Sequence, residues 1–205
     1  GLEGSHPWVE CLEGIGEVYL LIGKSDEAIG IFTTLLEYKE TAVEQALVYK
    51  NITEAYFKKG NFIQCEENGR KGLAILGEKI PTGKADVFIG LGKELAIHIG
   101  HTITALLGGK IDAKSHDPKY NIIVLFYKSL MWSYILTNLF KMLRSQLRVL
   151  NLCESKIGKS VELGMVTASY AGICQAIPLF NRSLKYDTKA LRIKEEFDDQ
   201  WGIAQ

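Results

Sequence analysis

Several features are scarce in this 205-residue sequence, and each scarcity excludes a class of protein. There are four prolines, which favours long uninterrupted helices. Lys and Arg total 24, as do Asp and Glu, so no net charge attracts nucleic acid or an anionic membrane. The cysteines form no CxxC pair, so we expect reduced core residues in a cytoplasmic protein; they are Cys11, Cys65, Cys153 and Cys174.

One segment, residues 121–140, is apolar enough to raise the question of a membrane span. Lys128 lies near its middle, and an ammonium group is costly to place in lipid. Polar side chains are also spread along it, and the sequence has no second segment of this kind. We therefore expect a buried helix in a layered α-protein and no contact with a membrane.

An internal repeat is the strongest signal in the sequence. Small, aromatic and turn positions follow one another at helical spacing in Ile15, Gly16, Tyr19, Gly23, Ala28 and Phe32. A second copy has Ile52, Tyr56, Gly60, Cys65, Gly69 and Gly72 in the corresponding places. The turn glycines Gly23 and Gly60 are 37 residues apart. This pattern resembles the tetratricopeptide repeat, a helix pair with a period of about 34 residues.

The remaining segments also read as helices. Gly108 and Gly109 end one long helix, Asp117 and Pro118 start the next, and Pro178 separates a divergent last pair. The expected spans are 84–107, 120–136, 139–157, an apolar helix from Gly158-Lys159-Ser160 to Ile177, and 180–197. The fold class predicted is all-α, a tetratricopeptide-like superhelix (α-α solenoid) of about nine antiparallel-paired helices, without strands.

For domain organisation, residues 1–7 are interpreted as a cloning remnant and lead-in, and 8–205 as a single helical-repeat domain. Trp201 to Gln205 reads as the opening of a further helix, after which the sequence stops. A solenoid cut inside a repeat leaves an apolar face uncapped. We therefore expect this chain to be a fragment of a longer polypeptide.

Three shorter runs carry a more particular resemblance. They are Gly77-Glu78-Lys79-Ile80-Pro81, Leu106-Leu107-Gly108-Gly109-Lys110, and the Asp117-Pro118 helix start. Together with the repeats, these runs are similar to the helical-repeat region of large bacterial signalling proteins. In that family, the region lies between an AAA-type ATPase module, sometimes with a serine/threonine kinase domain, and GAF and histidine kinase or cyclase modules. The resemblance implies a regulatory, interaction-bearing segment, with the catalytic modules outside this chain.

Motifs that suggest chemistry have simpler interpretations. Gly23-Lys24-Ser25 and Gly158-Lys159-Ser160 lack the upstream glycine and preceding strand of a phosphate-binding loop, so we interpret both as helix ends. His98 and His101 share one helix face and could hold a metal, but paired surface histidines are favoured because no acid or cysteine nearby completes a site. His116 beside Asp117 lacks a nucleophile. We predict no catalytic residue, no metal and no cofactor.

A peptide groove is the one functional feature that the fold itself supplies. In tetratricopeptide arrays the first helix of each pair lines a concave surface, and the register places two sets of side chains there. The candidates are Glu13, Glu17 and Leu20 with Glu10 and Leu21 from the first pair, and Lys50, Glu54, Phe57 and Lys58 with Leu47 from the second. This mixture favours a basic or amphipathic partner, and Glu54 speaks against capture of a C-terminal carboxylate. The alternative is a solvated face without a ligand.

Two functions follow as hypotheses. The first is a non-catalytic interaction module that binds a protein or peptide segment, neighbouring domains of the same polypeptide, or another copy of itself. The second is a small-molecule or lipid sensor, in which the apolar centre, residues 84–157, encloses an effector. An enzyme has no residue set to support it.

Overall fold

A computed structural model describes residues 6–109 and 117–203, and these residues form helices and their connections, without a strand. The predicted all-α class is thereby confirmed. Contacts between Cα atoms divide the chain into two compact units. Unit 1 comprises Gly1–Ile80 and Leu125–Leu139, and unit 2 comprises Pro81–Val124 and Phe140–Gln205. The expectation of one continuous repeat domain stays a prediction.

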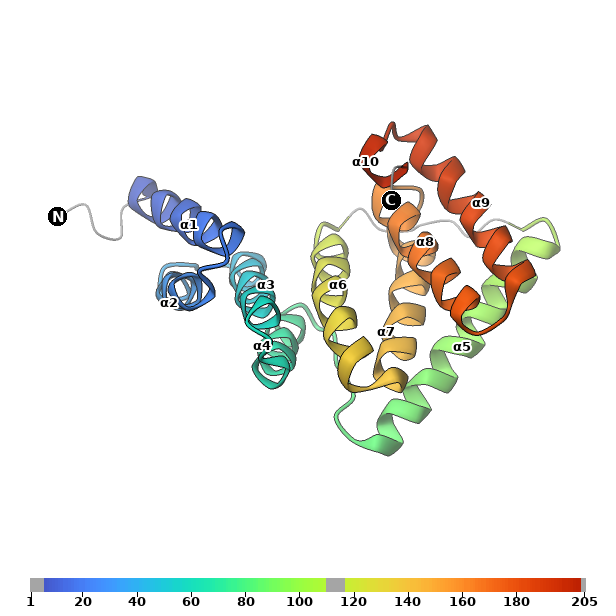
Figure 1. Ribbon diagram of the computed structural model, residues 1–205, viewed down its shortest axis with the longest axis horizontal. Helices are drawn as coiled ribbons and strands as arrows, with labels where there is room; N and C mark the ends of the chain where they lie inside the picture. The colour runs from blue at the N-terminus through green and yellow to red at the C-terminus, as the bar shows by residue number, and fades with distance from the viewer. Residues whose placement is uncertain (1–5, 110–116, 204–205) are drawn as a thin grey trace. The chain divides into compact units, whose positions relative to one another are not determined.

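Unit 1 begins with the two helix pairs that the repeat predicts. They are α1 (His6–Leu21) with α2 (Ser25–Leu35), and α3 (Ala42–Lys58) with α4 (Phe62–Ile75), the first four helices in Figure 1. Gly23 and Gly60, which follow α1 and α3, have φ angles of 79° and 77°. Only glycine adopts this left-handed conformation without a steric penalty, which explains both turn glycines. Helices adjacent in the sequence pack on one another, as a helical repeat requires.

The core of these pairs is made at the predicted small and aromatic positions. Ala28 and Phe32 of α2 are fully buried in one cluster with Ile52 and Ala55 of α3. A Cβ atom on Gly16 would lie 2.8 Å from the Phe32 ring, so the glycine allows α1 and α2 to approach closely. The small and aromatic positions of the repeat therefore lie where one helix crosses the next.

The apolar run that raised the membrane question is the helix α6 (Lys119–Thr137). In unit 1 its side chains pack on α4, where Leu130 faces Gly69 and the Phe126 ring faces Gly72. Phe126 and Leu130 are fully buried, as is Tyr127, whose hydroxyl donates to Glu78 at 3.0 Å. The predicted buried helix is thus confirmed for the middle of the run, whereas Trp132, Ile135 and Leu136 are 57%, 52% and 68% exposed, so the prediction was wrong for its end. Among the described residues, no helix is both long and apolar enough to cross a membrane.

Unit 2 contains the long helix and the divergent last pair. Its elements are α5 (Lys84–Leu106), α7 (Leu139–Leu152, its first residue assigned to unit 1), a π-helical turn η1 (Cys153–Ile157), α8 (Val161–Ala176), α9 (Phe180–Glu196) and the short α10 (Gln200–Ile203). These spans agree with the predicted ones, except that residues 153–157 wind as a π-helix. Asp117 accepts the Lys119 backbone N–H at 3.0 Å, which confirms the helix start.

The cysteines follow the expectation in part. Cys65, Cys153 and Cys174 are buried and free, whereas Cys11 is exposed on α1, so the prediction of a core position was wrong for Cys11. Burial raises the pKa of Cys65 and of Cys153 to about 12. Both thiols therefore stay protonated at neutral pH and act as small apolar residues.

Candidate functional site

The predicted groove of unit 1 neutralises much of its own charge. Glu13 lies 2.6 Å from the ammonium of Lys39, which is on the α2–α3 connection. Glu54 stands between two lysines of α3, 3.0 Å from Lys50 and 3.4 Å from Lys58. Burial alone would raise the pKa of Glu54, but these lysines outweigh it and lower the pKa below its usual range. Most of the charges proposed to select a partner are therefore already paired.

Other residues of that groove have mixed positions. Leu20 is 6% exposed and belongs to the core cluster, so it is not available to a partner. Lys58 also donates to the Leu20 carbonyl at 3.0 Å, which ties α3 to the end of α1. Glu17 is exposed and Phe57 half-buried, with its ring 6.3 Å from that of Phe62. Binding of a basic segment here stays a prediction.

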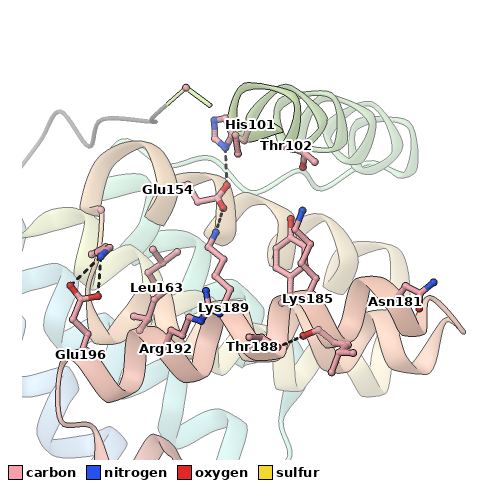
Figure 2. A pocket seen from close by; sticks show the side chains of 17 residues that line it. His101, Thr102, Glu154, Leu163, Asn181, Lys185, Thr188, Lys189, Arg192 and Glu196 are labelled. Carbon is pink, nitrogen blue, oxygen red and sulfur yellow. Dashed lines mark hydrogen bonds and ion pairs between the residues drawn. The ribbon is translucent and has the colours of Figure 1, made fainter. Parts of the chain in front are cut away.

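A concave site lies in unit 2, between the end of α5, the π-helical turn and one face of α9 (Figure 2). We call it the α9 groove; its volume is about 870 Å³. The residues of α9 that line it are Asn181, Leu184, Lys185, Tyr186, Thr188, Lys189, Arg192, Ile193 and Glu196. His101 and Thr102 of α5 line it from the opposite side, with Glu154 of the π-helical turn between.

A chain of polar contacts connects the walls of the α9 groove. His101 Nδ1 lies 2.9 Å from one oxygen of Glu154, and Lys189 Nζ lies 2.8 Å from the other, as the dashed lines in Figure 2 show. Burial would raise the pKa of Glu154, but the charge and hydrogen bond of Lys189 and the hydrogen bond of His101 lower it overall. Glu154 is therefore ionised at neutral pH and links α5 to α9.

The cations that line the groove are only partly neutralised. Lys159 is bound to Glu196, with Nζ–Oε distances of 2.9 and 3.1 Å. Lys189 forms an ion pair with Glu154. Lys185 and Arg192 are exposed and have no ion-pair partner within the part of the chain that the structure describes. The groove therefore presents two uncompensated positive charges on one helix face.

An aromatic cluster holds α9 in place behind the groove. The Tyr186 hydroxyl is 3.1 Å from His98 Nε2, and the Tyr170 ring packs edge-on against both His98 and Tyr186, at centroid distances of 5.0 and 4.7 Å. His98 is 1% exposed. The expectation of paired surface histidines was therefore wrong for His98, because this face of α5 packs against the two tyrosines. The cluster fixes the rotation of α9 and thus the direction of its groove face.

The described residues contain no cluster of three or more His, Cys, Asp or Glu side chains that could hold a metal ion. Both Gly-Lys-Ser runs are helix ends, as predicted. Gly158 has a φ angle of 78°, and the Ser160 hydroxyl accepts the Leu163 N–H at 3.2 Å. His116 lies outside the described residues.

Sequence reasoning missed the α9 groove. Lys185, Thr188 and Arg192 are spaced by three and four residues, so their common helix face could have been inferred from the sequence. The opposite wall could not, because Glu154 and His101 are 53 residues apart in the chain and no local pattern pairs them.

Comparisons with known proteins add no relative. A scan against protein-family models, a search of curated proteins and a search of solved structures each returned no match. The likeness to tetratricopeptide regions thus rests on the residues of the repeat.

Proposed function

We propose that this chain is a non-catalytic interaction module of the helical-repeat kind within a multidomain signalling protein. Its α9 groove binds an acidic amphipathic segment of a partner. The observation that carries the proposal is the pair of uncompensated cations, Lys185 and Arg192, on a groove-facing helix. A partner that neutralises them gains charge-assisted hydrogen bonds without breaking an internal pair.

The spacing of the two cations favours an extended or helical segment over a compact anion. Lys185 and Arg192 are seven residues apart on α9, which corresponds to two helical turns, or about 10.5 Å. Leu184, with 69% of its surface exposed, borders the same groove and offers an apolar contact beside the charges. The complementary partner has two acids about two turns apart and an apolar residue beside the acid that meets Lys185.

The groove is also held in one shape before a partner arrives. The chain from His101 through Glu154 to Lys189 joins its walls, and Tyr186 is anchored from behind by His98. A preformed site loses less side-chain freedom on binding, which leaves more of the contact energy as affinity.

A second candidate is a small anionic effector in the same groove. Its volume of about 870 Å³ lies within the range of small-molecule sites. His101 and Glu154 belong to the centre of the chain that the sensor hypothesis singled out. Binding of an effector would alter the junction of α5 and α9 and so could be relayed to an attached domain.

The test measures fluorescence anisotropy of labelled helical peptides added to the full chain. One peptide carries two glutamates seven residues apart, with a leucine next to one of them; a second has the same composition in shuffled order; a third replaces the glutamates by lysine. We expect saturable, salt-sensitive binding of the first peptide, weakened about tenfold or more by Lys185→Glu with Arg192→Glu. The matched control is Arg70→Glu with Lys128→Glu, which reverses two exposed cations of unit 1.

Equal affinity for all three peptides, or an affinity for the first peptide that Lys185→Glu with Arg192→Glu leaves unchanged, would show that this groove is not the binding site. Binding of citrate or pyrophosphate that depends on Lys185 and Arg192, without peptide binding, would establish the effector alternative in its place. Hydrolysis of ATP by the purified chain, beyond that of a mock purification, would overturn the non-catalytic assignment.

A further inference from the structure

A second surface, on α1 of unit 1, is independent of the α9 groove. One side of α1 packs into the core through Val9, Leu12, Gly16 and Leu20. The opposite side leaves apolar side chains in solvent: Ile15 is 41% exposed, Val18 53% and Ile22 61%. Cys11 is exposed on the same side, and a Cβ atom on Gly14 would meet nothing within 4 Å. We call this row of five residues the α1 face.

The internal repeat allows the α1 face to be compared with the equivalent residues of α3. A shift of 37 residues, from Gly23 to Gly60, maps the end of α1 at Leu21 onto the end of α3 at Lys58. The same shift maps Cys11, Ile15 and Val18 onto Val48, Ile52 and Ala55. Those three residues of α3 are 1%, 3% and 0% exposed, because they pack in one cluster with side chains of α2. The exposed α1 face is thus the equivalent of a buried helix-packing face.

The helix that covers α3 also defines the pattern that fits. α2 contributes Ala28, Phe32 and Leu35 to the shared cluster, each fully buried. A small residue, an aromatic one turn later and a leucine three residues further make up one helix face.

A difference between the two faces specifies the partner further. On α3 the position after the helix is Lys59, which forms an ion pair with Asp26 of α2. The corresponding residue beside α1 is Ile22. A helix that covers α1 therefore has no cation to meet at that point, and an apolar residue suits it better than an acid.

We propose that the α1 face is a docking site for a helix of a partner protein that presents the small–aromatic–leucine pattern of α2, with an apolar residue in place of Asp26. The helix packs on Ile15, Val18 and Ile22 as α2 packs on α3.

Cys11 allows the proposal to be tested on the full chain, because the other three cysteines are buried. Three synthetic peptides, each with a terminal cysteine prepared as its mixed disulfide with 2-mercaptoethanol, are equilibrated with the reduced protein and free 2-mercaptoethanol. The Cys11 thiolate attacks the peptide disulfide and 2-mercaptoethanol leaves as the thiol, so the exchange is reversible, and the protein–peptide disulfides are measured by mass spectrometry. One has the sequence of residues 24–38; one replaces its aspartate (Asp26) by leucine; one replaces its phenylalanine and leucine (Phe32 and Leu35) by alanine. Non-covalent docking raises the local peptide concentration, so capture reports docking.

We expect capture to be strongest for the leucine peptide, weaker for the unaltered sequence and about tenfold lower than the strongest for the alanine peptide. Val18→Glu should bring the leucine peptide down to the level of the alanine peptide. Ile63→Glu, at a position of α4 that is 80% exposed, is the matched control and should leave the preference intact.

Equal capture of the three peptides would overturn the proposal. So would sedimentation of the chain as a dimer that Val18→Glu dissociates, because a second copy would then cover the α1 face. Loss of helical circular dichroism in Val18→Glu would be detected separately, and Ile15→Gln then takes its place in the same assay.

Discussion

Unit 1 and unit 2 join their helices by different kinds of contact. In unit 1, small residues lie against large apolar ones at the helix crossings, as Gly16 lies against Phe32 and Gly72 against Phe126. The hydrogen bond from Tyr127 to Glu78 is a polar exception. In unit 2, buried polar side chains link helices distant in sequence. The Asn151 amide donates to the carboxylate of Glu94 at 2.8 Å and to its carbonyl at 2.9 Å.

The difference matters for function because each kind of contact leaves a different kind of surface. Close apolar stacking repeats along the chain, and a helix side that no other helix covers in this structure is an apolar face such as that of α1. Buried polar contacts fix side chains in direction and position, and the α9 groove lies beside them. Unit 1 therefore suits the packing of another helix, and unit 2 suits recognition of charge.

The largest expected difference between the two units is in the pH dependence of their stability. The pKa of His98 is lowered to about 4, chiefly by burial; the charge of Glu154 opposes this shift, and those of Arg182, His101 and Lys189 contribute to it. Because the unfolded ring has a pKa near 6.5, the neutral ring favours the folded state above that pH, and this contribution is lost as the pH falls toward 4. We expect unit 2 to lose about 3 kcal/mol over this window. Hydrogen exchange measured at pH 7 and 5 should show the first part of this loss in α5 and α9.

The matched variants are His98→Gln, which should flatten the pH dependence between 6.5 and 5, and His101→Gln, which should retain it. Carboxylates such as Glu154, whose pKa is lowered, contribute mainly below pH 4.5 and so fall outside that interval. An unchanged slope in His98→Gln would show that the buried ring is not the source.

Two glycine substitutions should sharpen the account of unit 1, because they are expected to act in opposite directions. A Cβ atom on Gly72 would collide with the Phe126 ring and lie 2.8 Å from the Cβ of Tyr49, so Gly72→Ala should lower the free energy of unfolding by about 1–3 kcal/mol. Gly30 lies in α2 with nothing within 4 Å of such an atom, so Gly30→Ala should raise it by about 0.5–1 kcal/mol. Urea unfolding followed by circular dichroism measures both. Equal effects would mean that the close crossing of unit 1 does not depend on glycine.

The sequence predicted the local parts of the fold because they depend on local physics. Gly23, Gly60 and Gly158 have the positive φ angles that glycine adopts freely where a helix ends, and Ser160 caps the next helix. The small and aromatic positions of α1 and α2 could be identified because their period is that of a helix face.

The missed features depend on contacts between distant segments. His98 is buried by tyrosines that follow it by 72 and 88 residues, and Glu94 is satisfied by Asn151, 57 residues later. Nothing near His98 or Glu94 in the sequence signals these partners. The α9 groove was missed for the same reason. The groove predicted in unit 1 drew on the repeat alone, which does not reveal that Leu20 is buried or that Glu13 is paired with Lys39.

The smallest expected effect concerns the two ion pairs of the α9 groove. Glu154 has a side chain only 10% exposed, whereas Lys159 and Glu196 are 66% and 52% exposed. Solvent screens the outer pair, so a double-mutant cycle with Lys159→Ala and Glu196→Ala should give a coupling below about 0.5 kcal/mol. The same cycle for the Lys189–Glu154 pair should give a larger coupling free energy, about 1 kcal/mol, because Glu154 is shielded from water. If the outer pair couples as strongly as the inner one, the polar contacts that distinguish unit 2 are not confined to its interior, and Lys159 belongs with them.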